Sequence, residues 1–396
     1  MKMLSSKERL LRAINLEETD RIPLWLNFFE RSYLLDSNAQ WRNQFERVDQ
    51  LLTLGLDDAV GISPPLAINK DVKIRKWKEI EPGEKYPVIA KEYETPRGFL
   101  RQVVRQTPDR PHPDDAHIFD DYNVPSARTK KYLVEDMNDL DALSLLFSQP
   151  NDDELSRFRN HTEQVKKFAM EKEVIVEGSG PMLGDAAVWL CGVNKVILAT
   201  LKEPEFLRRL LSIVHEWDMM QIRLLGEVGG VDVIFHRGWY ESTVFWSPKA
   251  YRTYLAPLIR EEIELVHKVG AKFGYIMTRE MTPLLEVFKE IGIDIIFGPD
   301  PVEGRCDLHQ MKTEVRDHIC LWGGVNSAVT LEFGTKKEIK KAVAEAIRTL
   351  APGGGFILGP IDCIYGRTAG TRETPPSSIG YIIEAWRELR EYPSSP

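Results

Sequence analysis

Val231-Asp-Val-Ile-Phe-His236-Arg-Gly-Trp239 shows the pattern that organises this chain: an apolar run ends in a polar cluster, and the helix-like stretch Ser247 to Gly270 follows. The same order recurs three more times in the last third of the sequence. The recurrences are Lys272-Phe-Gly-Tyr-Ile-Met277 before Pro283 to Ile291, Ile319-Cys-Leu-Trp-Gly-Gly-Val-Asn326 before Thr335 to Leu350, and Gly354-Gly-Phe-Ile-Leu-Gly-Pro-Ile-Asp-Cys363 before Pro375 to Leu389. Strands that alternate with helices predict βαβ units and a parallel sheet. Ligands bind at the carboxyl ends of such strands, where these polar clusters fall.

Earlier segments extend this rhythm toward the N-terminus. Leu24 to Phe29 is predicted as the first strand, Asp57 to Ser63 as the second, and Glu173 to Glu177 as a later one. The count reaches seven or eight strands, no linker divides them, and the last third lacks a dinucleotide fingerprint. We therefore expect one domain over residues 1–396, an α/β fold of the TIM-type (β/α)8 barrel class rather than an open doubly wound sheet.

Residues 70–132 break the rhythm after the second strand. Lys85 to Arg105 has strand-turn-strand character around Pro96-Arg-Gly98, and Asp109 to Asp121 is rich in proline and aspartate without a clear period. We interpret the segment as a hairpin and long loop that leave the barrel. Its role stays open among a lid, a docking surface and a dimer arm.

Composition limits the classes of function. The 396 residues are 43% hydrophobic and 28% charged with a net charge of -8, and their short basic stretches are too dilute for a nucleic-acid footprint. No run approaches the roughly 18 to 20 apolar residues of a membrane span, and the N-terminus lacks the apolar region of a signal peptide. The cysteines, without CxxC spacing, predict reduced thiols in a cytoplasmic protein. They are Cys191, Cys306, Cys320 and Cys363.

Three strand-end residues are candidates for metal binding or acid-base chemistry. His236 ends an apolar strand, and a neutral imidazole there could ligate a metal or move a proton; the alternative is a histidine bonded to a loop carbonyl. Glu177 ends the preceding strand and could join His236 across the barrel mouth, or pair with an arginine. Cys363 follows the final strand, where a thiolate would suit zinc, although buried cysteines are commonly structural.

Other strand ends carry groups suited to a substrate. Asp300 and Asn326 could orient it, and Tyr275 could donate a hydrogen bond or simply pack. Gly178 to Gly184 lacks GxGxxG spacing and is interpreted as a tight turn. No nucleophile elbow is present.

Four motifs resemble the uroporphyrinogen decarboxylase superfamily, and the resemblance covers nearly the whole chain outside residues 70–130. The motifs are Asp20-Arg-Ile-Pro-Leu-Trp25, Trp246-Ser-Pro-Lys-Ala-Tyr-Arg-Thr-Tyr-Leu-Ala-Pro257, Leu321-Trp-Gly-Gly-Val-Asn326 and Ala351-Pro-Gly-Gly-Gly-Phe-Ile-Leu358. The resemblance implies a TIM barrel and one of two chemistries, porphyrinogen decarboxylation or methyl transfer to or from a corrinoid protein. It also makes a homodimer plausible.

The decarboxylase branch fits poorly. Its arginine-rich loop would fall at Asn27 to Ser32, where Arg31 is the one cation, and its acidic residue would fall near Ser63 to Pro65, which has no carboxylate. A substrate with many carboxylates needs several fixed cations.

The methyltransferase branch fits better. Its zinc-dependent members carry a His-x-Cys pair where this chain has Tyr275-Ile-Met277, and phenol and thioether are poor zinc ligands. The third ligand of that branch matches Cys363. Any zinc site must therefore be rebuilt, and His236 and Glu177 are the expected partners.

The leading hypothesis is a methyltransferase that moves a methyl group from a small methylated donor, such as a methoxylated aromatic, to the corrinoid of a partner protein. Cleavage of a methyl ether needs a metal or a general acid at the leaving oxygen. His236, Glu177 and Cys363 are expected around zinc, with Tyr275 and Asn326 orienting the donor. The other expected substrate contacts are Trp25, Asn27, Arg237, Trp239 and Asp300.

Two alternatives remain. One is a decarboxylase of a small carboxylic acid or a porphyrinogen-like substrate, in which Arg31 or Arg237 fixes the carboxylate. The other is a barrel that binds a ligand without catalysis, which the missing His-x-Cys pair would explain.

Overall fold

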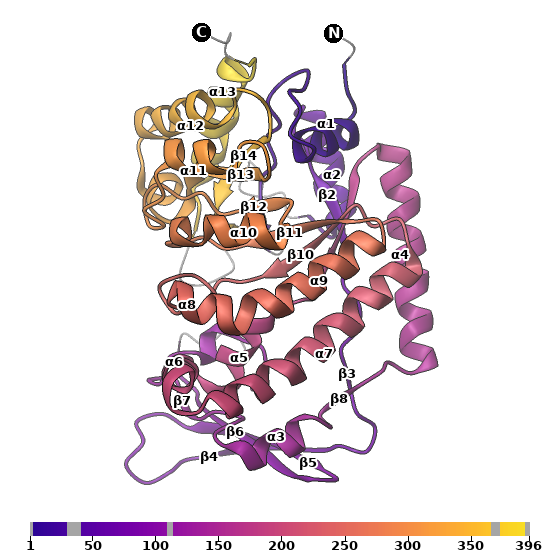
Figure 1. The fold of residues 1–396 in the computed structure, drawn as a ribbon, viewed down its shortest axis with the longest axis vertical. Coiled ribbons are helices and arrows are strands. Elements are labelled where there is room, and N and C mark those ends of the chain that lie inside the picture. Colours follow the sequence, from indigo (N-terminus) through magenta and orange to yellow (C-terminus); the bar gives the residue numbers. More distant parts are fainter. Residues whose placement is uncertain (1–2, 30–40, 109–113, 366–372, 393–396) are drawn as a thin grey trace.

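A curled sheet of parallel strands forms the centre of the computed structural model, which describes residues 3–29, 41–108, 114–365 and 373–392 (Figure 1). Seven strands lie side by side in the order β14-β13-β12-β11-β10-β9-β2, and every neighbouring pair is parallel. Their bounds are β2 Ala59–Ile62, β9 Ile175–Ser179, β10 Val233–Arg237, β11 Lys272–Ile276, β12 Ile295–Phe297, β13 Cys320–Asn326 and β14 Phe356–Ile361.

The predicted first strand links the two edges of this sheet. Leu24 bridges to Leu358 of β14, and Trp25 bridges to Asp57, just before β2. The backbone N–H of Trp25 donates to the Leu358 carbonyl at 3.0 Å, and the N–H of Asp57 donates to the Leu24 carbonyl at 3.0 Å. Beyond these bridges, β1 (Phe28–Phe29) pairs with β15 (Ile364–Tyr365). The prediction of a TIM-type α/β barrel is confirmed.

Helices alternate with the strands, as the repeated pattern predicts. Thr335 and Glu338 form a capping box at the start of one helix, and Ser247 caps the helix that Pro248 begins. The helices are α1 Ser6–Ile14, α2 Gln44–Thr53, α3 Met137–Leu143, α4 Asp152–Lys172, α5 Leu183–Cys191, α6 Val193–Lys202, α7 Pro204–Val228, α8 Pro248–Ala250, α9 Ala256–Lys268, α10 Leu285–Ile291, α11 Leu308–Val315, α12 Lys336–Leu350 and α13 Pro376–Leu389. In the described part of the chain no single helix is long and apolar enough to cross a membrane; the bent pair α5–α6 meets that test by length and composition alone.

Side chains on the strands alternate between two buried surfaces. The inward-facing set fills the barrel and includes Trp25, Val233, Phe235 and Trp322. The indoles of Trp25 and Trp322 stack at 4.0 Å with 12° between their planes. The outward-facing set, such as Ile234 of β10, packs beneath the surrounding helices.

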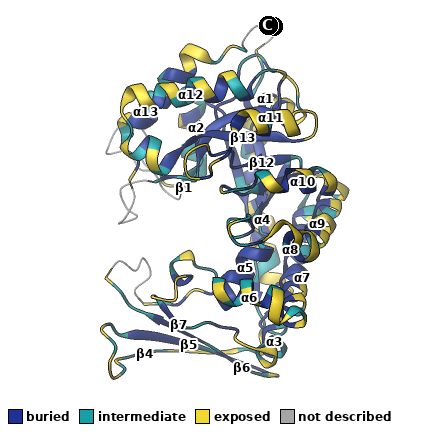
Figure 2. Cartoon of the chain, turned by 60° about the vertical axis from the view of Figure 1, so that its left-hand side comes forward, coloured by how far each residue is buried: buried dark blue, intermediate teal, exposed yellow. Residues whose placement is uncertain are grey.

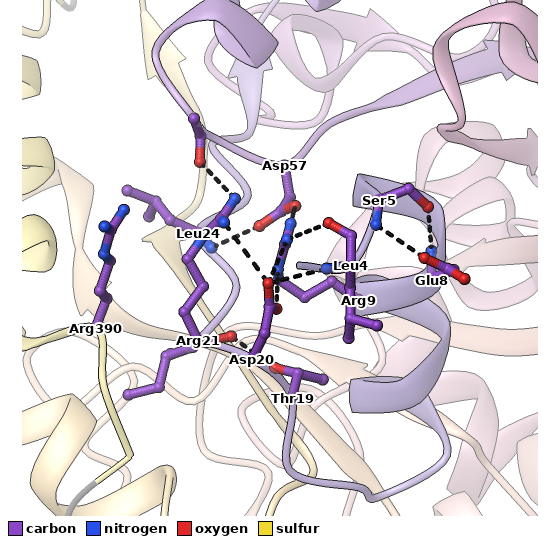
Figure 3. Close-up of polar contacts among 12 residues, drawn as sticks. Leu4, Ser5, Glu8, Arg9, Thr19, Asp20, Arg21, Leu24, Asp57 and Arg390 are labelled. Atoms are coloured by element: carbon purple, nitrogen blue, oxygen red, sulfur yellow. Dashed lines mark hydrogen bonds and ion pairs between the residues drawn. The ribbon is translucent and has the colours of Figure 1, made fainter. Parts of the chain in front are cut away.

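A buried arginine ties the N-terminal helix to the start of the barrel (Figure 3). Arg9 donates to Asp20 at 2.7 Å and to Asp57 at 2.6 Å, and its guanidinium also reaches the Leu4 carbonyl. Asp57 in turn accepts from the N–H of Leu24 at 3.3 Å. The aspartate of the Asp20-Arg-Ile-Pro motif is therefore part of the contact that positions the first strand.

The segment that leaves the barrel is an antiparallel sheet, β4-β5-β6-β7, which lies at the opposite end of the molecule from α12 and α13 (Figure 2). The predicted hairpin is β5 (Val88–Thr95) with β6 (Gly98–Arg105), and the sheet adds β4 (Lys73–Glu79) and β7 (Thr129–Lys131). The short pair β3 (Ala67–Ile68) and β8 (Phe147–Ser148) connects this sheet with the barrel.

Candidate functional site

A cavity of about 530 Å³ opens at the carboxyl ends of the barrel strands, and we refer to it as the mouth cavity. Five predicted site residues line it: Asn27, Arg237, Trp239, Asp300 and Cys363. They come from different strand ends, which meet because parallel strands of a barrel end on one face. The structure thus brings together half of the predicted site.

Asn27 and Cys363 meet where the first and last strands of the barrel end. The Asn27 amide donates to the Cys363 sulfur at 3.4 Å and to the Asp362 carbonyl at 3.1 Å. Asp362 has a positive φ of 70°, a left-handed conformation that aspartate adopts more readily than most residues. This kink at the end of β14 presents the half-buried thiol to the cavity.

Arg237 is already paired with protein carboxylates. Its guanidinium donates to the buried Asp185 and, at 2.6 Å, to Asp121, and it lies 4.4 Å from the ring centroid of Trp189. Burial raises the pKa of Asp185 to about 8, against the opposing charge of Arg237. Asp121 belongs to the 3-10 turn Asp121–Asn123, so this contact joins the segment outside the barrel to the mouth cavity.

Asn326 holds the side chain of Asp300 in place through a hydrogen bond. Its amide donates to Asp300 at 2.8 Å and to Glu303 at 3.2 Å, while its oxygen accepts from the N–H of Val329 at 2.7 Å. Asn326 is buried and does not line the mouth cavity, so the predicted contact with a substrate is replaced by a positioning role. Asp300 lines the cavity, and burial raises its pKa, while hydrogen bonds from the Val302 N–H and the Asn326 amide oppose that rise.

His236 and Tyr275 lie behind the sheet, which corrects their predicted position at the barrel mouth. His236 is fully buried between Glu262, 2.6 Å from Nδ1, and Glu241, 3.1 Å from Nε2. The Tyr275 hydroxyl donates to the same Glu241 and lies 3.0 Å from the Tyr251 hydroxyl. Both side chains project outward because they occupy the alternate positions to the inward-facing Phe235.

Two carboxylates determine the charge of His236. Burial alone would lower the pKa of the imidazole, but Glu241 and Glu262 together raise it well above its usual value. Both ring nitrogens are already within hydrogen-bond distance of these carboxylates, so neither is directed toward the mouth cavity.

Glu177 lies inside the barrel, in register with Gly61 of β2 and Val233 of β10, below the mouth cavity. Burial raises its pKa to about 7; the charge of Arg47 opposes this rise and Asp58 adds to it. The predicted metal ligands His236, Glu177 and Cys363 are therefore on three different surfaces. Within the described ranges no group of three histidine, cysteine, aspartate or glutamate side chains could hold a metal ion. The predicted zinc site does not fit this arrangement.

Trp25 was predicted to contact the substrate, but the residue is 3% exposed and its indole stacks within the barrel core. Sequence reasoning missed the carboxylates that pair with two of the predicted residues: Asp121 and Asp185 with Arg237, and Glu262 with His236. Asp185 follows the Gly178–Gly184 turn, which is a signal that could have drawn attention to it. Asp121 and Glu262 pair with partners 116 and 26 residues away, and no local pattern reveals them.

Comparison with known proteins adds a family and a fold. A family model described as Uroporphyrinogen decarboxylase (URO-D) matches residues 121–389, more than half of the chain. No curated protein sequence matches.

Among solved structures, a methyltransferase from Methanosarcina mazei is 18% identical with a TM-score of 0.58, and the match covers 97% of this chain and 99% of that one. At this identity the likeness shows the fold alone. A 3-keto-D-glucoside 4-epimerase from E. coli is 14% identical with a TM-score of 0.37, over 58% of this chain and 84% of the other. That second score is too low to support an argument.

Proposed function

This chain belongs to the uroporphyrinogen decarboxylase (URO-D) family, and from that premise we propose that it is a corrinoid-dependent methyltransferase rather than a porphyrinogen decarboxylase. The charge of the mouth cavity carries the proposal. Two arginines line it, and both are paired: Arg237 with Asp121 and Asp185, and Arg279 with Glu303 at 3.3 Å. The lining carboxyl groups are Asp121, Asp300, Glu303 and Asp362.

Among the residues that the structure describes, a substrate with several carboxylates would meet this acidic lining and no unpaired arginine. Arg31, the one further cation expected there, lies outside the described residues. A neutral methylated donor has no such conflict. The full-length fold similarity to the methyltransferase from Methanosarcina mazei is consistent with this choice.

The residues of the mouth cavity suit an acid-assisted transfer. A corrinoid carried by a partner protein would supply the nucleophile. The methyl group would leave the ether oxygen for that corrinoid, and the oxygen would need a proton in its place. Asp300 is the proposed donor of that proton, because burial raises its pKa and Asn326 fixes its orientation. Asn27 and Trp239 line the same cavity and are proposed to position the donor.

The direct test is methyl transfer in vitro. The purified chain is incubated with a panel of aryl methyl ethers and chemically reduced cobalamin, and methylcobalamin is followed by its absorbance. We expect formation that depends on the protein and on one class of ether. A decarboxylase would instead release carbon dioxide from a small carboxylic acid or a porphyrinogen-like substrate without cobalamin. That release, with no methylcobalamin from any ether, would contradict the proposal.

A further inference from the structure

A second cavity, of about 620 Å³, lies between the barrel and the antiparallel sheet, and we refer to it as the sheet cavity. Ile74 and Tyr93 line it from β4 and β5, and Pro181 and Phe235 line it from the barrel. Arg237 and Ile276 line both cavities, so a molecule in the sheet cavity would adjoin the mouth cavity. The residues proposed to act in methyl transfer line the mouth cavity, so no ligand has been assigned to the sheet cavity.

Aromatic rings dominate one wall of the sheet cavity. Phe119 stacks on Phe147 at a centroid distance of 5.8 Å and 21° between the ring planes, and it lies 5.6 Å from the centroid of Trp189. Rings arranged in this way favour a flat aromatic ligand, which gains both apolar burial and offset or edge contacts.

Gln221 of α7 places one polar group on this wall. The side chain is 2% exposed, and its Nε2 has no hydrogen-bond partner among the described residues. A Cβ at Gly180 would lie 2.3 Å from the Gln221 Oε1, so glycine at 180 leaves room for the amide beside the cavity. Nε2 itself has almost no accessible surface, so a half-turn of the amide is needed to bring it to the cavity. Because a buried amide donor without a partner is unfavourable, a ligand oxygen that accepts from the turned amide would be selectively stabilised.

Size narrows the class of ligand. An apolar cavity of roughly 150 Å³ holds a benzene ring, whereas the sheet cavity is about 620 Å³. We propose that the sheet cavity binds an aromatic molecule of two or three rings, with an oxygen acceptor that pairs with the Gln221 amide. The further statement that this molecule is the methyl donor, with its methoxy end reaching past Arg237 and Ile276 into the mouth cavity, rests on the proposed function; the binding itself does not.

Equilibrium dialysis of the full chain, without cobalamin, tests the binding. The probes are 2-acetylnaphthalene, which has an acceptor oxygen, and 2-ethylnaphthalene, which has a similar shape without one. We expect the first probe to bind about fivefold or more tightly than the second, as one hydrogen bond implies. Gln221→Met, which keeps the shape and removes the donor, should abolish that difference.

Two further variants locate the binding. Ile74→Trp adds bulk from the sheet side and should weaken both probes about tenfold or more. Ile80→Trp is its matched control, because Ile80 is 80% exposed and does not line the cavity, and it should bind as wild type does. Circular dichroism verifies that each variant is folded.

Three results would overturn the inference: no binding of either probe, equal affinity for the two probes in wild type, or undiminished binding by folded Ile74→Trp. The binding experiment and the methyl-transfer assay test the two proposals separately. Binding as described without methyl transfer contradicts the methyltransferase, while transfer unaffected by Ile74→Trp contradicts the sheet cavity as a donor site.

Discussion

Glu262 accepts a 2.6 Å hydrogen bond from Nδ1 of His236, and neither side chain is exposed to solvent. Glu262 is on α9 and His236 is on β10, so the pair fixes a helix to the outer face of the barrel. The other carboxylate oxygen of Glu262 lies 3.4 Å from Nδ1 of His215 on α7. One glutamate therefore connects two helices and a strand through charged contacts.

His236→Ala is expected to destabilise the protein rather than remove a catalytic group. The substitution leaves Glu241 and Glu262 buried without their shared cation, and loss of one partner from a buried ion pair costs about 3–5 kcal/mol. Urea unfolding at neutral pH measures the change, with the exposed His318→Ala as the control. A folded His236→Ala variant of wild-type stability would contradict the structural role.

The position of His236 shows what strand alternation can and cannot predict. The period of two places Val233 and Phe235 on one face of β10 and Ile234 and His236 on the other. Both faces of a parallel barrel strand are apolar, so the pattern contains no contrast that marks the inner one. The strand, its end and the residues that share each face could be predicted from the sequence. Which face points outward is determined by contacts with α9, and these could not.

Glu177→Gln is expected to make the unfolding free energy less dependent on pH. The pKa of Glu177 is raised from 4.5 to about 7 by burial. A raised pKa means that the folded state holds the proton more tightly, so this contribution to stability is complete below pH 4.5 and is lost as the pH rises through 7. Between pH 4.5 and 8 the unfolding free energy of the wild type should fall by about 2–3 kcal/mol because of this group, and that of the variant should not.

Urea titrations at pH 5 and pH 8 compare wild type with Glu177→Gln. Glu173→Gln is the matched control, since Glu173 is exposed at the end of α4. Parallel pH profiles for the wild type and Glu177→Gln would show that the carboxyl group ionises normally inside the barrel.

Arg9→Met is expected to cost about 3–5 kcal/mol of unfolding free energy, because it leaves the buried Asp57 without its cation. Chemical denaturation followed by circular dichroism gives the value. Arg12→Met, on the exposed side of the same helix, should change stability by less than about 0.5 kcal/mol. Equal effects of the two variants would mean that the contact between Arg9, Asp20 and Asp57 contributes little.

The mouth cavity was more predictable than the network behind it. Asn27, Arg237, Asp300 and Cys363 were found because strand ends of a parallel barrel converge by topology. In the antiparallel sheet, the hairpin of β5 and β6 was predicted, but β4 and β7 were not. Its strand β4 has an exposed, mainly basic surface, so it lacks the apolar alternation that marks a strand, and its pairing with β5 is set by tertiary contact.

Asp300→Asn is expected to lower kcat/KM for methyl transfer by about 10²–10⁴-fold, the usual contribution of a general acid. An amide of the same shape keeps an oxygen for the bond from Asn326, loses the one that accepts from the Val302 N–H, and has no proton acidic enough for the leaving oxygen. The pH profile separates this loss from a structural one. The wild-type rate should fall as the pH rises through the pKa of Asp300, which burial raises, and the residual rate of the variant should lack that limb. Asp317→Asn, an exposed aspartate outside the cavity, serves as the control. A variant with the wild-type rate, or with the same high-pH limb, would assign the proton to another group.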